Sequence, residues 1–228
     1  MDNYDDIADE YDAYGDEAVT DIEIGYKNVL KLLGNVRGKK ILDYGCGVGK
    51  FSRILKDLGA DVIGVDIAEK ELTIAAQKNP DIVFLTVEDA RQKFAHSCDG
   101  AVMNFVATIH PLEMLEGLFS STRHFLKQDG KFVMLNSNYE KSLGREFLSF
   151  SVGKTKQEIG SPLKVWLGAA RSIEINEHYY SNEYYVSVLE RAGFSVETIV
   201  EPLADTRNYA WKDETVSPPF SIIAAIAS

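Results

Sequence analysis

The sequence predicts an α/β protein built around a mostly parallel sheet. Two observations lead to this fold class. Apolar runs of strand length alternate with segments of helical periodicity between residues 40 and 136, and a strand, a glycine-rich turn and a helix follow one another over residues 41–58. Alternating strands and helices imply right-handed crossovers, and therefore a parallel sheet covered on both faces. Ligands of such sheets bind beyond the carboxyl ends of the strands.

We expect the first 34 residues to form an arm and a helix. Residues 1–16 are acidic and carry Tyr4, Tyr11 and Tyr14, whereas residues 17–34 place apolar side chains along one helical face and end at Gly34. The chain of 228 residues is long enough for one α/β domain with an insertion, so we expect a single domain.

A glycine-rich turn follows the first expected strand. Residues 41–51 read I-L-D-Y-G-C-G-V-G-K-F, in which the apolar start suits a strand buried on both faces. Gly45, Gly47 and Gly49 allow positive φ and a close approach of the backbone to a ligand. The carboxylate of Asp43, just ahead of the glycines, repels a pyrophosphate and attracts an ammonium group, so the turn suits a cationic ligand. Asp43 as a simple helix cap stays open.

The next elements keep the same order. We expect further strands at 61–66, 82–87, 99–105 and 131–136, and helices at 50–58, 69–78, near 90–95 and at 111–127. Residues 139–181 break the rhythm and show no clear strand, so we expect a lid there. The chain then returns to a helix at 182–191 and to strands at 194–200 and 220–227.

Five motifs in order resemble a known family. The glycine turn is followed by G-V-D-I-A at 64–68, E-D-A at 88–90, V-M-N-F at 102–105 and F-L-K-Q-D-G-K-F-V-M-L at 125–135. Together they resemble the small-molecule type of the class I (Rossmann-like) S-adenosylmethionine-dependent methyltransferases. The resemblance implies a doubly wound, seven-stranded, mostly parallel sheet with an antiparallel C-terminal edge hairpin and a lid after the fifth strand. It also implies S-adenosylmethionine as cofactor and S-adenosylhomocysteine as product.

The resemblance assigns roles around the cofactor. Asp66 would hold the ribose hydroxyls, and Asp89 and the backbone of Ala90 would bind adenine, although both carboxylates are also suited to capping a helix. Phe105 would stack near adenine or acceptor, or belong to the core. The residues expected to bind the cofactor are Tyr11, Asp43, Gly45, Gly47, Gly49, Asp66, Ile67, Asp89, Ala90, Asn104 and Phe105.

Three side chains are candidates for catalysis. His110 follows the fourth strand and suits a general base, because its reference pKa lies near neutrality, but it also precedes Pro111 and is placed to cap a helix. His178 lies in the run Glu177–Tyr180, which suits substrate recognition or ordinary aromatic packing. Tyr11 completes the set, in an arm that resembles the segment many small-molecule methyltransferases fold over the cofactor.

The composition limits the classes of partner that we expect this protein to bind. The net charge is −11, with 35 acidic and 24 basic side chains, and the basic residues do not cluster, which disfavours nucleic acid. No leader and no apolar run of roughly 20 residues is present, so we expect a cytoplasmic protein that does not bind membranes, as a monomer or homodimer. Cys46 and Cys98 are read as reduced structural thiols, and no metal is expected.

The sequence therefore predicts methyl transfer to an O, N or C atom of a small, aromatic or hydrophobic molecule. Two alternatives remain: a regulatory or partner protein that binds the cofactor without catalysis, and a NAD(P)-dependent oxidoreductase, which would need G-x-G-x-x-G where Lys50 takes the third glycine's place. Within the single domain 1–228 we expect an arm and helix (1–34), a cofactor-binding core (35–138), a substrate lid (139–181) and a C-terminal helix with edge strands (182–228).

Overall fold

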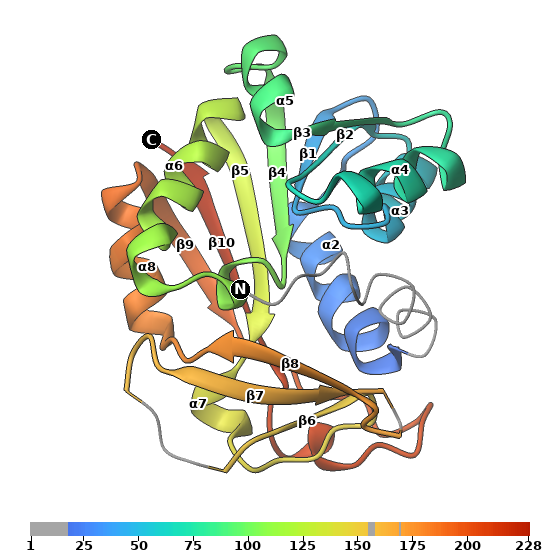
Figure 1. The fold of residues 1–228 in the computed structure, drawn as a ribbon, viewed down its shortest axis with the longest axis vertical. Coiled ribbons are helices and arrows are strands. Elements are labelled where there is room, and N and C mark those ends of the chain that lie inside the picture. The colour runs from blue at the N-terminus through green and yellow to red at the C-terminus, as the bar shows by residue number, and fades with distance from the viewer. Residues whose placement is uncertain (1–17, 155–157, 169) are drawn as a thin grey trace.

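The computed structural model describes residues 18–154, 158–168 and 170–228. Its centre is a seven-stranded sheet in the order β3-β2-β1-β4-β5-β10-β9 (Figure 1). These strands are β1 (Lys40–Tyr44), β2 (Asp61–Asp66), β3 (Val83–Thr86), β4 (Cys98–Asn104), β5 (Leu126–Ser137), β9 (Phe194–Val200) and β10 (Phe220–Ala227). The first five strands pair in parallel, and β10 runs antiparallel to both β5 and β9. The expected sheet and its antiparallel edge hairpin are confirmed.

Helices cover both faces of the sheet. The described helices are η1 (Asp21–Tyr26), α2 (Lys27–Leu33), α3 (Lys50–Asp57), α4 (Glu69–Lys78), α5 (Val87–Lys93), η2 (Ala107–Ile109), η3 (Leu112–Met114), α6 (Leu115–Phe125), α7 (Tyr139–Ser142), α8 (Asn182–Arg191) and η4 (Asp213–Thr215). Buried apolar side chains form two clusters, one with η1, α2 and α3 and the other with α5, α6 and α8. Consecutive residues of a strand point to opposite faces of the sheet, and both Val102 and Met103 of β4 are fully buried. The central part of the sheet is therefore covered on both faces.

Several element boundaries differ from the sequence prediction. The N-terminal helix contains a π-helical segment, η1, after residues 19 and 20, and the short helix after β3 starts at Val87 rather than near residue 90. The fifth strand begins at Leu126, so the helix expected over 111–127 ends at Phe125 and its first turn is the separate 3₁₀ helix η3. Boundaries are weakly encoded locally, because the sheet pairing that extends β5 comes from tertiary contacts.

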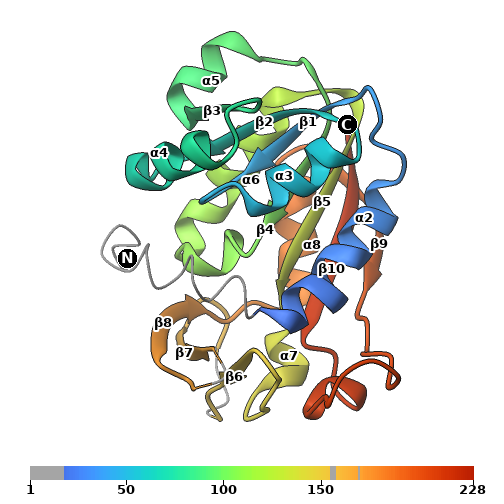
Figure 2. The ribbon, with the colours of Figure 1, turned by 90° about the vertical axis from the view of Figure 1, so that its right-hand side faces the viewer.

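The expectation of no clear strand in residues 139–181 is wrong. This segment contains a three-stranded antiparallel sheet of β6 (Phe150–Val152), β7 (Pro162–Leu167) and β8 (Ile173–His178). Buried and exposed residues alternate along β7 and β8, which is the period of a strand with one covered face. The small sheet lies at the end of the molecule toward which β4 and β5 point (Figures 1 and 2), and we call residues 139–181 the lid.

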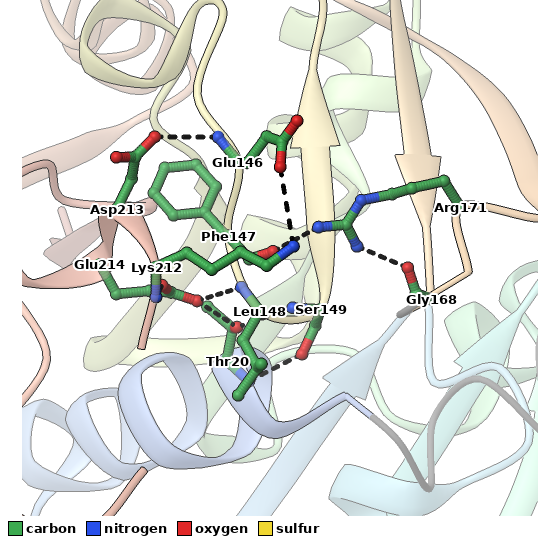
Figure 3. A network of polar contacts seen from close by, with 10 residues as sticks. All are labelled: Thr20, Glu146, Phe147, Leu148, Ser149, Gly168, Arg171, Lys212, Asp213 and Glu214. Atoms are coloured by element: carbon green, nitrogen blue, oxygen red, sulfur yellow. Dashed lines mark hydrogen bonds and ion pairs between the residues drawn. The ribbon is translucent and has the colours of Figure 1, made fainter. Parts of the chain in front are cut away.

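A buried polar network joins the lid to both ends of the described chain (Figure 3). The carboxylate of Glu214, which is fully buried, accepts hydrogen bonds from the hydroxyl of Thr20 (2.9 Å) and from the backbone N–H of Leu148. Thr20 also donates its N–H to the hydroxyl of Ser149 (3.0 Å) and accepts the N–H of Ser149 (3.2 Å). Because Thr20, Ser149 and Glu214 are buried and paired, breaking one of these hydrogen bonds leaves a buried polar atom unsatisfied.

Candidate functional site

A cavity of about 240 Å³ opens at the carboxyl ends of β1 and β4. One wall comes from the glycine turn and the start of α3, a second from the end of β4, and a third from the N-terminal helical segment. The lining residues are Ala18, Asp21, Ile22, Tyr26, Asp43, Gly45, Cys46, Gly47, Val48, Lys50, Phe51, Ile54, Asn104 and Phe105. The position agrees with the rule that ligands of parallel sheets bind beyond the strand ends.

The glycines of the turn adopt the positive φ that the sequence predicts. Gly45, Gly47 and Gly49 have φ of 73°, 51° and 80°. A Cβ on Gly45 would lie 2.2 Å from Cγ2 of Val106, and a Cβ on Gly49 would lie 2.8 Å from the Phe84 ring. Both the backbone conformation and the packing therefore exclude side chains at these two positions.

Asp43 is a buried carboxylate on the cavity wall. It is 1% exposed and accepts a hydrogen bond of 2.6 Å from the hydroxyl of Ser52. Burial raises the pKa of Asp43 to about 6, and the negative charge of Asp66 adds to the effect. A cation entering this cavity would favour the ionised carboxylate, so the site matches a positively charged ligand.

Asp66 ties the glycine turn to the end of β2. One carboxylate oxygen accepts the N–H of Gly47 (2.9 Å), and the other accepts those of Ile67 (2.7 Å) and Ala68 (3.0 Å). The side chain is half-buried and does not line the cavity described above. Ile67 is 69% exposed beside it, so an apolar surface stands next to the carboxylate.

Asp89 forms a reciprocal helix cap in this structure. The hydroxyl of Thr86 donates to its carboxylate (3.0 Å), and its own N–H donates to that hydroxyl (3.2 Å). Asp89 is exposed, whereas its neighbour Ala90 is fully buried. The contact with adenine expected for both residues stays a prediction.

The last residue of β4 and its successor have unusual features. Both side-chain polar atoms of Asn104 are buried and have no hydrogen-bond partner among the described residues. Phe105 has φ of 59°, a conformation that costs a bulky residue about 1–3 kcal/mol and that gathers at functional sites. Asn104 lines the first cavity, and a buried amide without a partner is uncommon in a folded protein, so a ligand or an ordered water in the cavity would satisfy it.

A second, smaller cavity lies between the lid and the central sheet. Its volume is about 20 Å³ in this conformation, and it shares Asp21 and Phe105 with the first cavity. The lining residues are Asp21, Phe105, Ser137, Phe150, Val165, Leu167, Ile175, Glu177 and Phe220. Sequence reasoning missed Asp21, Phe150 and Phe220, because nothing local distinguishes them before the lid folds against the sheet.

Glu177 places a second buried carboxylate on the wall of this smaller cavity. It is 4% exposed and accepts a hydrogen bond from the phenol of Tyr139, and burial raises its pKa. The hydroxyl of Tyr185 is buried and has no partner among the described residues. The sequence analysis noted Glu177 only as part of the run Glu177–Tyr180, whereas its inward position follows from the alternation of buried and exposed residues along β8.

The two candidate histidines lie outside the walls of both cavities. Nδ1 of His110 is 2.9 Å from the carbonyl oxygen of Val106. Because a carbonyl only accepts, Nδ1 carries the proton, and burial lowers the pKa of the ring and favours its neutral form. Nδ1 of His178 is 3.3 Å from the carbonyl oxygen of Thr108. Catalytic roles for both stay predictions, and Tyr11 lies outside the described residues.

The described residues contain neither a metal-binding cluster nor a helix that could span a membrane. Among residues 18–154, 158–168 and 170–228, no group of three or more His, Cys, Asp or Glu side chains is arranged to hold a metal ion. In the same residues, every helix is too short or too polar to cross a bilayer.

Comparisons with known proteins agree with this geometry. The family model described as "Methyltransferase domain" matches residues 18–199. A ubiquinone biosynthesis O-methyltransferase of Bordetella avium is 47% identical over 47 residues, which cover 21% of this chain and 20% of that protein. The human mitochondrial ubiquinone biosynthesis O-methyltransferase is 28% identical over 200 residues, covering 81% of this chain and 50% of that protein. The chain thus spans half or less of the length of these two relatives.

A solved structure gives the same fold. The 1,6-didemethyltoxoflavin-N1-methyltransferase of Burkholderia thailandensis superposes with a TM-score of 0.62 at 17% sequence identity, over 96% of this chain and 83% of that one. The sheet order, the glycine turn and a family match over most of the chain lead to one conclusion: the chain belongs to the methyltransferase domain family, as a class I S-adenosylmethionine-dependent methyltransferase.

Proposed function

We propose that the chain transfers the methyl group of S-adenosylmethionine to a small, aromatic or hydrophobic molecule. The observation that carries the proposal is the pair of adjoining cavities, one walled by the glycine turn and one by apolar residues of the lid, which meet at Asp21 and Phe105. In our proposal the cofactor occupies the first cavity, the acceptor enters the second, and the transferred methyl lies near the shared wall.

The residues of the first cavity fit this cofactor. The glycine turn leaves room for a ligand against the backbone, Asp43 suits an ammonium group, and the unpaired amide of Asn104 offers an NH2 group that donates and a carbonyl oxygen that accepts. We propose that Asp66, beside exposed Ile67, binds the ribose hydroxyls. Asp89 and Ala90 would bind adenine, with Phe105 against the ring or the acceptor, as the sequence resemblance implies.

The sulfonium of the bound cofactor supplies an already activated methyl group. The protein therefore contributes alignment of the acceptor atom with the methyl carbon, which is a large part of the rate enhancement in reactions of two bound groups. The lid, fixed to the N-terminal helical segment through Thr20 and Ser149, would keep water away from the shared wall.

The names of the relatives support a small acceptor. Both ubiquinone biosynthesis relatives are O-methyltransferases, and a small lid-covered cavity suits a metabolite better than a polymer. The net charge of −11 further disfavours nucleic acid. We also propose action in the cytoplasm, as a monomer or homodimer, with the division of the domain at residues 34, 138 and 181 given above.

Calorimetric titration with S-adenosylhomocysteine tests the cofactor site. We expect binding with 1:1 stoichiometry, and at least tenfold weaker binding by Asp66→Ala. Asp61→Ala is the matched control, because Asp61 begins the same strand at its opposite, exposed end. A wild-type protein that binds neither S-adenosylmethionine nor S-adenosylhomocysteine would refute the proposal.

Incubation with methyl-labelled cofactor and a metabolite panel then separates the enzyme from its alternatives. A protein that binds the cofactor but transfers no methyl group to any acceptor would be a regulatory or partner subunit. Binding of a nicotinamide dinucleotide in place of the adenosyl cofactor would favour an oxidoreductase, although Lys50 stands where that motif needs a glycine.

A further inference from the structure

Phe105 lies at the boundary between the two cavities. It lines both of them, and among the described residues only Asp21 does the same. In-line methyl transfer needs the acceptor atom within roughly 3–3.5 Å of the methyl carbon, so cofactor and acceptor must touch at this boundary. The ring of Phe105 is therefore placed where the two ligands of the proposed reaction would meet.

The smaller cavity is too small for an organic acceptor in the conformation described. Its volume is about 20 Å³. One water-sized group needs roughly 10–15 Å³, so the cavity has room for one such group. An acceptor can enter only after part of the wall has moved. Two parts of the wall come into question, the lid and the ring of Phe105.

The lid is held by several buried polar contacts (Figure 3). Thr20 and Ser149 exchange two hydrogen bonds, of 3.0 and 3.2 Å, and the hydroxyl of Thr20 donates to the carboxylate of Glu214 (2.9 Å). Phe150 of the lid also stacks on Phe220 of β10, with ring centroids 5.6 Å apart. Lifting the lid would break these hydrogen bonds together and leave buried polar atoms unsatisfied.

The ring of Phe105 is easier to move. Phe105 is half-buried, and its ring meets that of Phe220 edge to face with centroids 5.3 Å apart. An aromatic pair of this kind contributes less than a set of buried hydrogen bonds. The side chain can turn between staggered rotamers without any change in the lid. The ring is therefore the part of the wall that gives way first.

The backbone at Phe105 stays in place when the ring turns. Its N–H donates to the carbonyl oxygen of Leu135 (2.8 Å), and the next residue, Val106, packs against the glycine turn, where a Cβ on Gly45 would lie 2.2 Å from its Cγ2. The φ of 59° is unfavourable for a bulky residue. Strain of this kind persists where the surrounding structure fixes it, and it gathers at functional sites. The fixed backbone directs this side chain to the boundary.

We propose that the ring of Phe105, in the conformation described, occupies the place of a flat apolar acceptor, which enters by turning the ring aside. Phe105 is then a specificity-determining residue, because the space that its side chain vacates sets the size and shape of the acceptor. The acceptor's ring takes over the edge-to-face contact with Phe220. This inference rests on the proposed function and narrows its substrate class to molecules with a small aromatic ring.

Toluene bound beside the cofactor tests the proposal. The full chain is saturated with S-adenosylmethionine that carries a ¹³C-labelled methyl group, and toluene is titrated in while NMR spectra are recorded. Toluene has the flat ring but no nucleophilic heteroatom, so it is not consumed. In Phe105→Ala the space is permanently open, and small aromatic molecules bind in apolar cavities of this kind. We expect toluene to bind this variant at least tenfold more tightly than the wild type, with a nuclear Overhauser effect between its ring protons and the labelled methyl.

Two further variants control for cavity formation and for folding. Phe119→Ala removes a fully buried ring from α6, which belongs to the other apolar cluster and lines neither cavity. Toluene bound in that variant should show no Overhauser effect to the cofactor methyl. Phe105→Leu keeps an apolar side chain and serves if Phe105→Ala does not fold. We expect a smaller gain in toluene affinity for Phe105→Leu, with the Overhauser effect still present.

The outcomes separate this inference from the proposed function. Toluene that binds the wild type as tightly as Phe105→Ala, or that binds the variant without contact to the labelled methyl, would overturn the role of the ring while the methyltransferase function stands. Failure of the wild-type protein to bind S-adenosylmethionine and S-adenosylhomocysteine would overturn the proposed function, and this inference with it.

Discussion

Replacing Asp43 with asparagine should stabilise the empty protein while weakening the cofactor site. The carboxyl group is 1% exposed, and its pKa of about 6 in the folded state exceeds the ordinary value of 3.8. The folded state therefore holds the proton more tightly than the unfolded state does. The stability that this protonation contributes is fully present below pH 3.8 and is lost as pH rises through 6.

The magnitude follows from the two pKa values. Ionising the buried carboxyl group at pH 7.5 costs the folded state about 3 kcal/mol relative to a neutral side chain, and about half of that at pH 5. Asparagine stays neutral and its carbonyl oxygen can still accept from Ser52. We expect the free energy of unfolding of Asp43→Asn to exceed that of the wild type by up to about 3 kcal/mol at pH 7.5, and by less at pH 5.

Urea denaturation followed by circular dichroism at the two pH values measures this difference. Calorimetry at pH 7.5 should show at least tenfold weaker binding of S-adenosylhomocysteine by the same variant, because the amide cannot offer a charge to its ammonium group. Asp61→Asn, at an exposed position, should change neither quantity. A variant that is less stable than the wild type at pH 7.5, or equally different at both pH values, would refute the reasoning from burial.

Three other substitutions test other parts of the structure. Gly45→Ala should abolish cofactor binding or soluble expression, because the new Cβ would lie 2.2 Å from Val106 and the residue has a φ of 73°. Gly117→Ala is the control: a Cβ there has no atom within 4 Å, so this variant should fold normally and bind S-adenosylhomocysteine as the wild type does in calorimetry. Glu214→Ala should lower the free energy of unfolding by about 3 kcal/mol or more, since it strands several buried donors; a loss below about 1 kcal/mol in urea denaturation would contradict the network. His110→Ala should lower kcat less than tenfold, because the ring lies outside both cavities; a hundredfold loss with unchanged affinity for S-adenosylhomocysteine would instead identify this histidine as the base.

The cavity at the glycine turn was predictable because its signals are local. The glycine turn, Asp43 before it and Asp66 nineteen residues after Gly47 are read directly from strand–turn–helix order. The positive φ at the glycines follows from the same short segment, and so does the burial of the strand that precedes them. The mostly parallel sheet follows from the alternation of strands and helices, and its antiparallel edge hairpin from the family resemblance.

The smaller cavity was less predictable because it forms only after distant segments meet. Asp21 reaches the shared wall from a π-helix, which has no reliable sequence signature, and Phe150 and Phe220 are 70 positions apart in the sequence but stack in the structure. The strands of the lid do carry an alternating pattern, visible in I-E-I-N-E-H at 173–178. Glycines and polar residues surround that pattern, so the segment as a whole does not show the apolar runs that mark the strands and helices of the core.

The network around Glu214 has a consequence for how the molecule is made. Thr20 and Glu214 are separated by 194 residues, yet the hydroxyl of Thr20 donates a hydrogen bond to the carboxylate of Glu214. A nascent chain on the ribosome can therefore pair β1 with β2 long before it can dock its lid, which must wait until η4 has emerged. Translation that stops before this point would release a polypeptide able to form the glycine-turn wall of the larger cavity while the side that faces the lid stays open to solvent.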